Sequence, residues 1–153
     1  EKKFVSISQA NLDLDSEEEK KEIEEKTAEN KDMLTAMKDA LADKVKEVRI
    51  SSRLIDDPVC IVADEGVSLD MERYMANDPM NKDRAITATK ILEINPNHPI
   101  FNKLREVSTS SPDKLKEYTD VLYDQALLIE GLPIKNPVEF AKKITNLIVD
   151  AKN

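Results

Sequence analysis

The first pattern along the chain is that of an amphipathic helix. Three large apolar residues recur at intervals of four, and residues with that spacing share one face of an α-helix. They are Met33, Met37 and Leu41. Asn30 stands just before them, where an N-cap residue is expected. From Val45 onward the pattern changes to alternation, so we predict that this helix ends near Lys44.

Three later segments have the patterns of short β-strands. Residues 45–51 alternate between polar and apolar positions, and residues 58–63 form a continuous apolar run that is typical of a central strand. Residues 89–95 alternate again, and Asn95-Pro96 ends the pattern. Because helical patterns separate these segments, the sequence predicts an α+β fold with a small three-stranded sheet and helices packed on it.

The last third of the chain predicts a hairpin of two helices. Residues 110–113 supply a cap, a helix-initiating proline and a first-turn acid for the first helix. Gly131 can adopt the left-handed conformation that ends this helix, and Pro133 prevents its continuation. Residues 136–139 then open the second helix with a capping box and a proline at its first position.

The two helices of the hairpin carry more apolar surface than they can bury against each other. Either the strand layer covers the remainder, or an identical hairpin covers it and makes a four-helix bundle across the twofold axis of a homodimer. For the second arrangement we assign eight apolar residues to the dimer interface. They are Leu122, Ala126, Leu127, Ile129, Phe140, Ile144, Leu147 and Ile148.

A segment dense in charge precedes all of these elements. Residues 13–26 contain one large apolar residue after Leu14, namely Ile23, so they lack the apolar stripe of a packed helix. We interpret the segment as a solvated helix or a linker. A coiled-coil arm over residues 13–44 is an alternative, but the heptad pattern that it needs is poor.

Charge and composition then exclude several kinds of partner. The chain has 31 acidic against 23 basic residues, and a net charge of -8 repels nucleic acid and anionic lipid surfaces. No apolar run approaches the roughly 20 residues that cross a bilayer, and the first residues lack the apolar stretch of a signal peptide. We therefore expect a cytoplasmic protein without nucleic-acid or membrane partners. Because there is no initiating Met, we also expect a piece of a longer protein.

The sequence offers no set of catalytic, cofactor-binding or metal-binding residues. With only two glycines, the chain has no glycine-rich loop for phosphate. Cys60 stands in the most apolar strand, as a small buried residue would, and His98 stands where a helix begins, where capping explains it. A zinc site needs three or four nitrogen or sulfur ligands. A small enzyme based on Cys60 or on the carboxylates is the rival hypothesis, and it requires a convergent polar pocket.

One local pattern points to binding. Four residues fall at i, i+4, i+7 and i+8, which makes one apolar face of a short helix. They are Val67, Met71, Tyr74 and Met75. Methionine side chains adapt to varied partners, so an exposed face of this kind suits binding of unfolded segments. A stripe with this spacing is more often part of a core, so the pattern alone favours a buried location.

Four segments form an ordered series that covers most of the chain, from about residue 30 to the end. They are VRISSRLIDDPVCIV at 48–62, MERYM at 71–75, LEINPNHPIFNKL at 92–104 and YDQALLIEG at 123–131. The series resembles the carboxy-terminal dimerisation domain of the heat shock protein 90 family, in its bacterial form. The resemblance implies that residues 1–28 are the end of a middle domain with a charged linker, and that residues 29–153 are the dimerisation domain.

The resemblance also implies a function. The parent would be a molecular chaperone of the stress response whose ATP and magnesium bind in an amino-terminal domain, so this part of it would hold no cofactor and would not be an enzyme. It would join two protomers as a clamp, and the helix at residues 68–76 would help to hold non-native client proteins. Val67, Met71, Tyr74 and Met75 would then contact clients. The alternative is a generic dimeric adaptor or scaffold without chaperone activity.

The end of the sequence departs from eukaryotic cytosolic relatives. It reads LIVDAKN at 147–153, where they carry an acidic Met-Glu-Glu-Val-Asp peptide. We therefore do not expect docking of tetratricopeptide co-chaperones.

Overall fold

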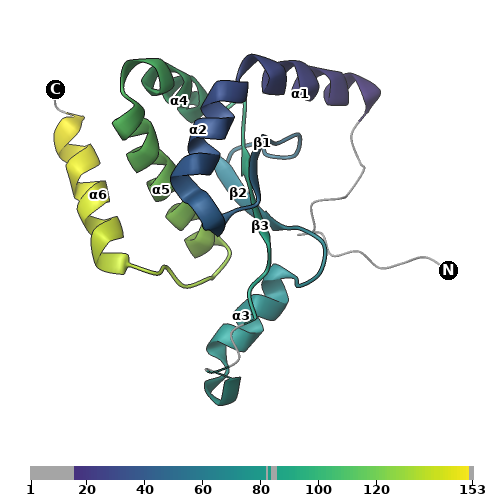
Figure 1. The fold of residues 1–153 in the computed structure, drawn as a ribbon, viewed down its shortest axis with the longest axis vertical. Coiled ribbons are helices and arrows are strands. Elements are labelled where there is room, and N and C mark those ends of the chain that lie inside the picture. The colour runs from purple at the N-terminus through teal and green to yellow at the C-terminus, as the bar shows by residue number, and fades with distance from the viewer. Residues whose placement is uncertain (1–15, 82, 84–85, 152–153) are drawn as a thin grey trace.

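The computed structural model describes residues 16–81, 83 and 86–151, and Figure 1 shows how they fold. Residues 1–15, which are part of the predicted end of a middle domain, lie outside the described residues. The elements follow in this order: α1 (Glu17–Glu29), α2 (Lys31–Leu41), the 3-10 turn η1 (Ala42–Lys44), β1 (Glu47–Ile50), β2 (Val59–Ala63), α3 (Leu69–Asn77), the 3-10 turn η2 (Pro79–Asn81), β3 (Lys90–Ile94), α4 (Pro99–Ser110), α5 (Pro112–Ile129) and α6 (Pro137–Asp150). The predicted α+β class with a small three-stranded sheet is confirmed for the described residues.

The three strands form a mixed sheet in the order β1-β3-β2. β3 runs parallel to β1 and antiparallel to β2. The three predicted strands are therefore confirmed, but the prediction that residues 58–63 form a central strand is wrong. β2 lies at an edge, and its apolar run reflects burial on both faces, since Ile61 and Val62 are both buried. β3 is the central strand although it carries two charged residues, Lys90 and Glu93.

Helices α2, α4 and α5 lie on one side of this sheet and enclose the core with it (Figure 1). Met33, Met37 and Leu41 are buried on α2, as their spacing predicts. α5 is at the centre of the helical layer because it contacts α2, α4 and β2. Burial of these aliphatic side chains is the main favourable contribution to folding.

The junction of the first two helices differs from the prediction at Asn30. Its Nδ2 donates to the carbonyl oxygen of Lys26 at 2.8 Å, so Asn30 closes α1 and forms no side-chain cap for α2. The described part of the charged segment forms α1, which has no buried residue, so the prediction of a solvated helix is confirmed. A capping box between Ser16 and Glu19 begins α1.

The predicted hairpin is formed by α5 and α6. Gly131 has a φ of 70°, in the left-handed region that closes α5, as expected. Asn136 accepts a hydrogen bond from the N–H of Glu139 at 3.2 Å and so begins α6. Ser111 occupies the N-cap position of α5 without a side-chain bond, so the proline that follows is the start signal that acts there.

The opposite face of the sheet buries a carboxylate. The side chain of Glu93 is 4% exposed. Arg49 of β1 donates to its Oε2 from Nε and Nη2, at 2.8 and 2.6 Å, and Arg53 donates to its Oε1 at 2.9 Å. Burial by itself would raise the pKa of Glu93, but the hydrogen bonds from Arg53 and Arg49 outweigh it and hold the pKa below its ordinary value. The carboxylate stays ionised and ties β1 and the loop after it to β3.

This cluster predicts how stability depends on pH. A group whose folded pKa is lowered adds stability above its unfolded pKa and loses that contribution as the pH falls through the folded pKa. Because Glu93→Gln leaves two arginines facing a neutral amide, we expect the free energy of unfolding at pH 7 to fall by about 3 kcal/mol. Urea unfolding should show this deficit shrinking below about pH 4.

Glu65→Gln, which removes an exposed carboxylate, is the matched control for Glu93→Gln. It should change the free energy of unfolding by no more than about 0.5 kcal/mol. A Glu93→Gln deficit that is absent at pH 7, or that stays constant in acid, would contradict the role given to the buried carboxylate.

Candidate functional site

Helix α3 stands apart from the helical layer and projects beyond the end of the sheet (Figure 1). It begins after Ser68, whose Oγ accepts a hydrogen bond from the N–H of Met71 at 3.1 Å. The helix predicted from the apolar face at residues 67–75 is therefore present, with the bounds Leu69–Asn77.

The inner side of α3 is fixed to the body of the chain. Leu69 is fully buried, and Val67 packs against the core from the preceding turn. One turn further on, Glu72 forms an ion pair with the buried Nζ of Lys90 at 2.7 Å and accepts a hydrogen bond from the N–H of Ala88 at 2.9 Å. These contacts hold α3 at the start of the central strand β3.

The outer side of α3 exposes apolar side chains. Met71 is 50% exposed and Tyr74 is 68% exposed, whereas Met75 and Val67 are half-buried. Of the four residues expected to contact clients, the structure brings two to the open surface, and Val67 belongs to the edge of the core. Met80 in η2 is also exposed. The sequence pattern missed it because it lies outside the helical spacing of the other four.

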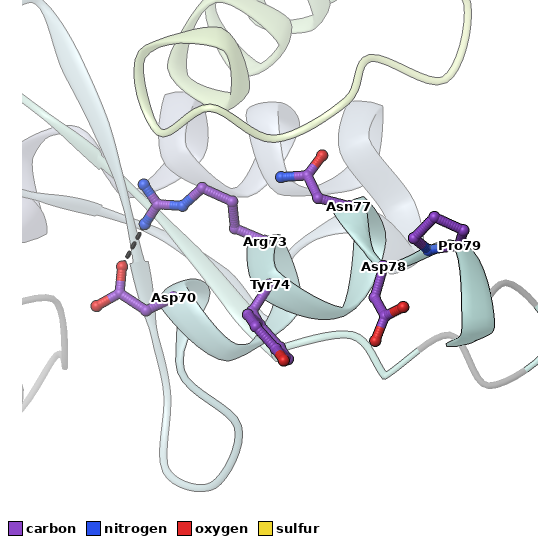
Figure 2. Close-up of a pocket in the computed structure, with 6 residues that line it drawn as sticks. All are labelled: Asp70, Arg73, Tyr74, Asn77, Asp78 and Pro79. Atoms are coloured by element: carbon purple, nitrogen blue, oxygen red, sulfur yellow. Dashed lines mark hydrogen bonds and ion pairs between the residues drawn. The ribbon is translucent and has the colours of Figure 1, made fainter.

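An open pocket of about 540 Å³ lies along α3 (Figure 2). It is lined by Asp70, Arg73, Tyr74, Asn77, Asp78 and Pro79. Arg73 forms an ion pair with Asp70, and its side chain lies against Gly131, where an added Cβ would come within 3.3 Å of Arg73 Cδ. α3 therefore touches the turn that ends α5. No sequence pattern identified the acidic residues of the pocket, because polar residues on an exposed helix are ordinary.

The eight residues assigned to a dimer interface differ in burial. Three are buried in the core of the chain itself: Leu122, Ala126 and Leu127. Three are half-buried on the α5 side of α6: Phe140, Ile144 and Leu147. Two are exposed: Ile129 and Ile148. Because the first three side chains are already covered by their own chain, we leave them out of the surface proposed below.

Helix α6 has no buried residue, although it rests on α5. Lys143 binds Asp120 of α5 at 3.1 Å on its inner side. Burial would lower the pKa of Lys143, but hydrogen bonds to Asp120 and Glu139 raise it above its ordinary value, so the lysine stays charged.

The outer side of α6 and the end of α5 expose apolar residues. They are Val138, Ile148 and Val149 of α6, with Leu128 and Ile129 of α5. These five residues are referred to below as the hairpin patch. A shallow groove between Val138 and Thr145 runs along the same helix.

Comparison with known proteins assigns the chain to a family. The family model described as Hsp90 protein matches residues 1–152. The chain belongs to the Hsp90 protein family. Relatives with the name Chaperone protein HtpG are 46% identical over 149 residues in Bacillus subtilis, 47% over 148 residues in Clostridium acetobutylicum and 44% over 148 residues in Clostridium perfringens. Each comparison covers 97% of this chain, and the chain spans about a quarter of the length of these relatives.

In this Hsp90-family chain Cys60 is half-buried in β2, and His98 stands at the start of α4. Burial, followed by the nearby charge of Glu93, raises the pKa of the Cys60 thiol to about 12, so the thiol stays protonated and is a poor nucleophile. His98 accepts a hydrogen bond at Nδ1 from the N–H of Ile100 at 3.1 Å and caps α4, as expected.

In the part of the chain that the structure describes, no three histidine, cysteine, aspartate or glutamate side chains are grouped to hold a metal ion. None of its helices combines the length and the apolar character that spanning a membrane requires.

The attachment of α3 can be tested at Glu72. Because Glu72→Gln leaves the buried Lys90 without its carboxylate partner, we expect α3 to open more often. Hydrogen exchange of the amides in Leu69–Asn77 should accelerate about tenfold or more relative to the core strand β3. Glu106→Gln removes an exposed partner of Lys103 and is the control. Unchanged exchange in α3 would show that this ion pair does not hold the helix.

Proposed function

We propose that the chain is the carboxy-terminal dimerisation domain of an HtpG-type molecular chaperone. It holds two protomers together as a clamp, and its helix α3 contributes to the binding of unfolded client proteins. The relatives with the name Chaperone protein HtpG support the chaperone assignment. In this proposal residues 1–28 are the end of the middle domain with its linker, residues 29–153 are the dimerisation domain, and ATP and magnesium bind elsewhere in the parent.

The hairpin patch is the observation that carries the dimer proposal. The patch consists of five large apolar side chains that are exposed on the two helices of the hairpin. The second of these helices, α6, has no buried residue. A stable interface buries on the order of 800 Å² on each partner. A second hairpin would cover the patch, and two hairpins side by side make a four-helix bundle.

Dimerisation gives the parent chaperone a physical advantage. Two protomers that are joined at one end hold their other domains at a high effective concentration, so a second contact between these domains becomes an intramolecular step. The binding free energy of the hairpins is thereby used to control closure of the clamp. The parent would work in the cytoplasm, with non-native proteins and its own second copy as partners.

The client-binding part of the proposal rests on the exposure of Met71 and Tyr74. Both side chains are accessible on a helix that projects from the fold, and the helix is anchored independently through Leu69 and Glu72. Unbranched, polarizable methionine and the flat ring of tyrosine can pack against many different apolar side chains. This surface therefore suits segments of varied sequence.

The dimer contact can be tested at Ile148, which is 62% exposed in the single chain. Because Ile148→Asp puts a charge where the proposed interface is apolar, we expect the dissociation constant of the dimer to rise about a hundredfold. Light scattering and sedimentation at micromolar concentration would measure it. Because this side chain is already exposed in the single chain, its substitution should leave the fold intact. A weaker dimer would then reflect loss of the contact between protomers.

Ile55→Asp is the matched control for the dimer test. Ile55 lies in the loop between β1 and β2 and is 86% exposed, so the same substitution changes the same residue type outside the hairpin. It should leave the dissociation constant unchanged. The dimer proposal fails if the chain is a monomer at micromolar concentration, or if the two variants weaken the dimer equally.

Client binding can be tested with the pair Met71→Ser and Tyr74→Ser. We expect binding of a permanently unfolded probe, reduced carboxymethylated α-lactalbumin, to weaken about tenfold because two apolar contacts are lost. Ile55→Ser is the control, and circular dichroism confirms that α3 persists. Unaltered binding in the double variant would remove α3 from the client site.

The generic dimeric adaptor is distinguished by the same two measurements. It predicts a dimer that is sensitive to Ile148→Asp and a chain that binds no non-native protein. The chaperone proposal requires both the dimer and the binding.

A further inference from the structure

The carboxy-terminal end of α3 favours a cation that the helix does not itself supply. The unpaired carbonyl groups at the end of a helix carry a partial negative charge, which basic residues in the last turn usually compensate. The structure describes all of α3, and its last turn contains no basic residue. Its C-cap residue is Asp78, which adds a full negative charge to the same end.

The carboxylate of Asp78 is held in place by two uncharged donors. Its Oδ1 accepts a hydrogen bond from the N–H of Met80 at 2.9 Å, and its Oδ2 accepts one from Nδ2 of Asn81 at 2.7 Å. Both donors are uncharged. Among the residues that the structure describes, none forms an ion pair with Asp78. Within the described residues, the carboxylate is therefore oriented in advance and has no cationic partner.

An aromatic ring lies beside this carboxylate. Figure 2 shows Tyr74 and Asp78 projecting from the same side of α3, while Arg73 points to the other side. The face of a phenol ring attracts cations. Arg73 is the one basic residue among the six that line the pocket, and its ion pair with Asp70 and its contact with Gly131 keep it away from the ring.

We propose that Tyr74 and Asp78 hold the guanidinium or ammonium group of an arginine or lysine in an unfolded client segment. Met71 lies one turn before Tyr74 and takes an apolar neighbour of that cationic residue. The proposal rests on the proposed client-binding function of α3 and specifies which segments the helix selects. The net charge of -8 also attracts cationic segments, and it acts over a longer range than the contacts with Tyr74 and Asp78.

Three labelled peptides test the proposal. They share their apolar residues and differ at one central position, which is arginine, citrulline or glutamate. Citrulline has nearly the shape of arginine without its charge, so it isolates the electrostatic part of binding. At low salt we expect the arginine peptide to bind about fivefold more tightly than the citrulline peptide, and the glutamate peptide to bind most weakly. Fluorescence anisotropy should show the difference narrowing as salt is added.

Variants of the chain then locate the preference. Tyr74→Leu keeps an apolar side chain and removes the ring, and Asp78→Asn keeps an oxygen that can accept from Met80 N–H and removes the charge. Each substitution should remove most of the difference in affinity between the arginine and citrulline peptides. Asp113→Asn is the control, because Asp113 is an exposed acid in the first turn of α5. The 18 residues of α5 place it about 27 Å from the turn that α3 touches.

Met71→Ser separates this proposal from the proposed function. It should weaken the binding of all three peptides alike, because it removes an apolar contact and no charge. Equal affinity for the arginine and citrulline peptides, with Met71→Ser still weakening both, would overturn the cationic preference and leave client binding at α3 in place. If no peptide binds, or if Met71→Ser has no effect, both proposals fail.

One further outcome would test only whether Tyr74 and Asp78 are the residues that bind the cation. An arginine preference that persists unchanged in both Tyr74→Leu and Asp78→Asn would come from another part of the acidic chain. That result would overturn the assignment to these two residues.

Discussion

A charge that is buried on the central strand must find a partner, and β3 has two such charges. Glu93 is bound by Arg49 and Arg53, and Lys90 is bound by Glu72. An unpaired ion in such surroundings destabilises a fold by several kcal/mol, so each pairing constrains a segment that is distant in sequence. The first ties β1 and the loop after it to the sheet. The second determines where α3 stands, so the outer face of that helix depends on an interaction inside the fold.

The two helices of the hairpin are buried to different extents in a single chain. α5 is part of the core, whereas α6 has no buried residue and leaves Ile148 and Val149 in solvent. A helix of this length depends mainly on tertiary contacts for its stability. A second hairpin would bury what the first leaves exposed and would stabilise α6 at the same time. The proposed contact between protomers would therefore involve α6 and the last turn of α5, and not the buried middle of α5.

Local signals predicted the elements better than they predicted the partners of those elements. The stripe on α2, the left-handed Gly131 and the cap at Asn136 are as expected, because each depends on residues close in sequence. Asn30 occupies the expected N-cap position of α2, but its side chain bonds to Lys26 and closes α1, since one side chain can serve either end. Residues 58–63 are as apolar as a central strand yet lie at an edge, because strand order depends on pairing that a local pattern does not encode.

The same distinction explains which site residues could be predicted. The spacing of Met71 and Tyr74 placed them on one face, and the structure puts that face outside because Leu69 and Glu72 fix the other one. A fixed helix loses no backbone freedom on binding, so the entropic cost falls on its side chains alone. Methionine adapts its shape to a partner, whereas the charge of Asp78 attracts only one sign. In the proposed function, broad apolar binding with a preference for cations would depend on the ion pair between Glu72 and Lys90, because this pair holds α3 in place.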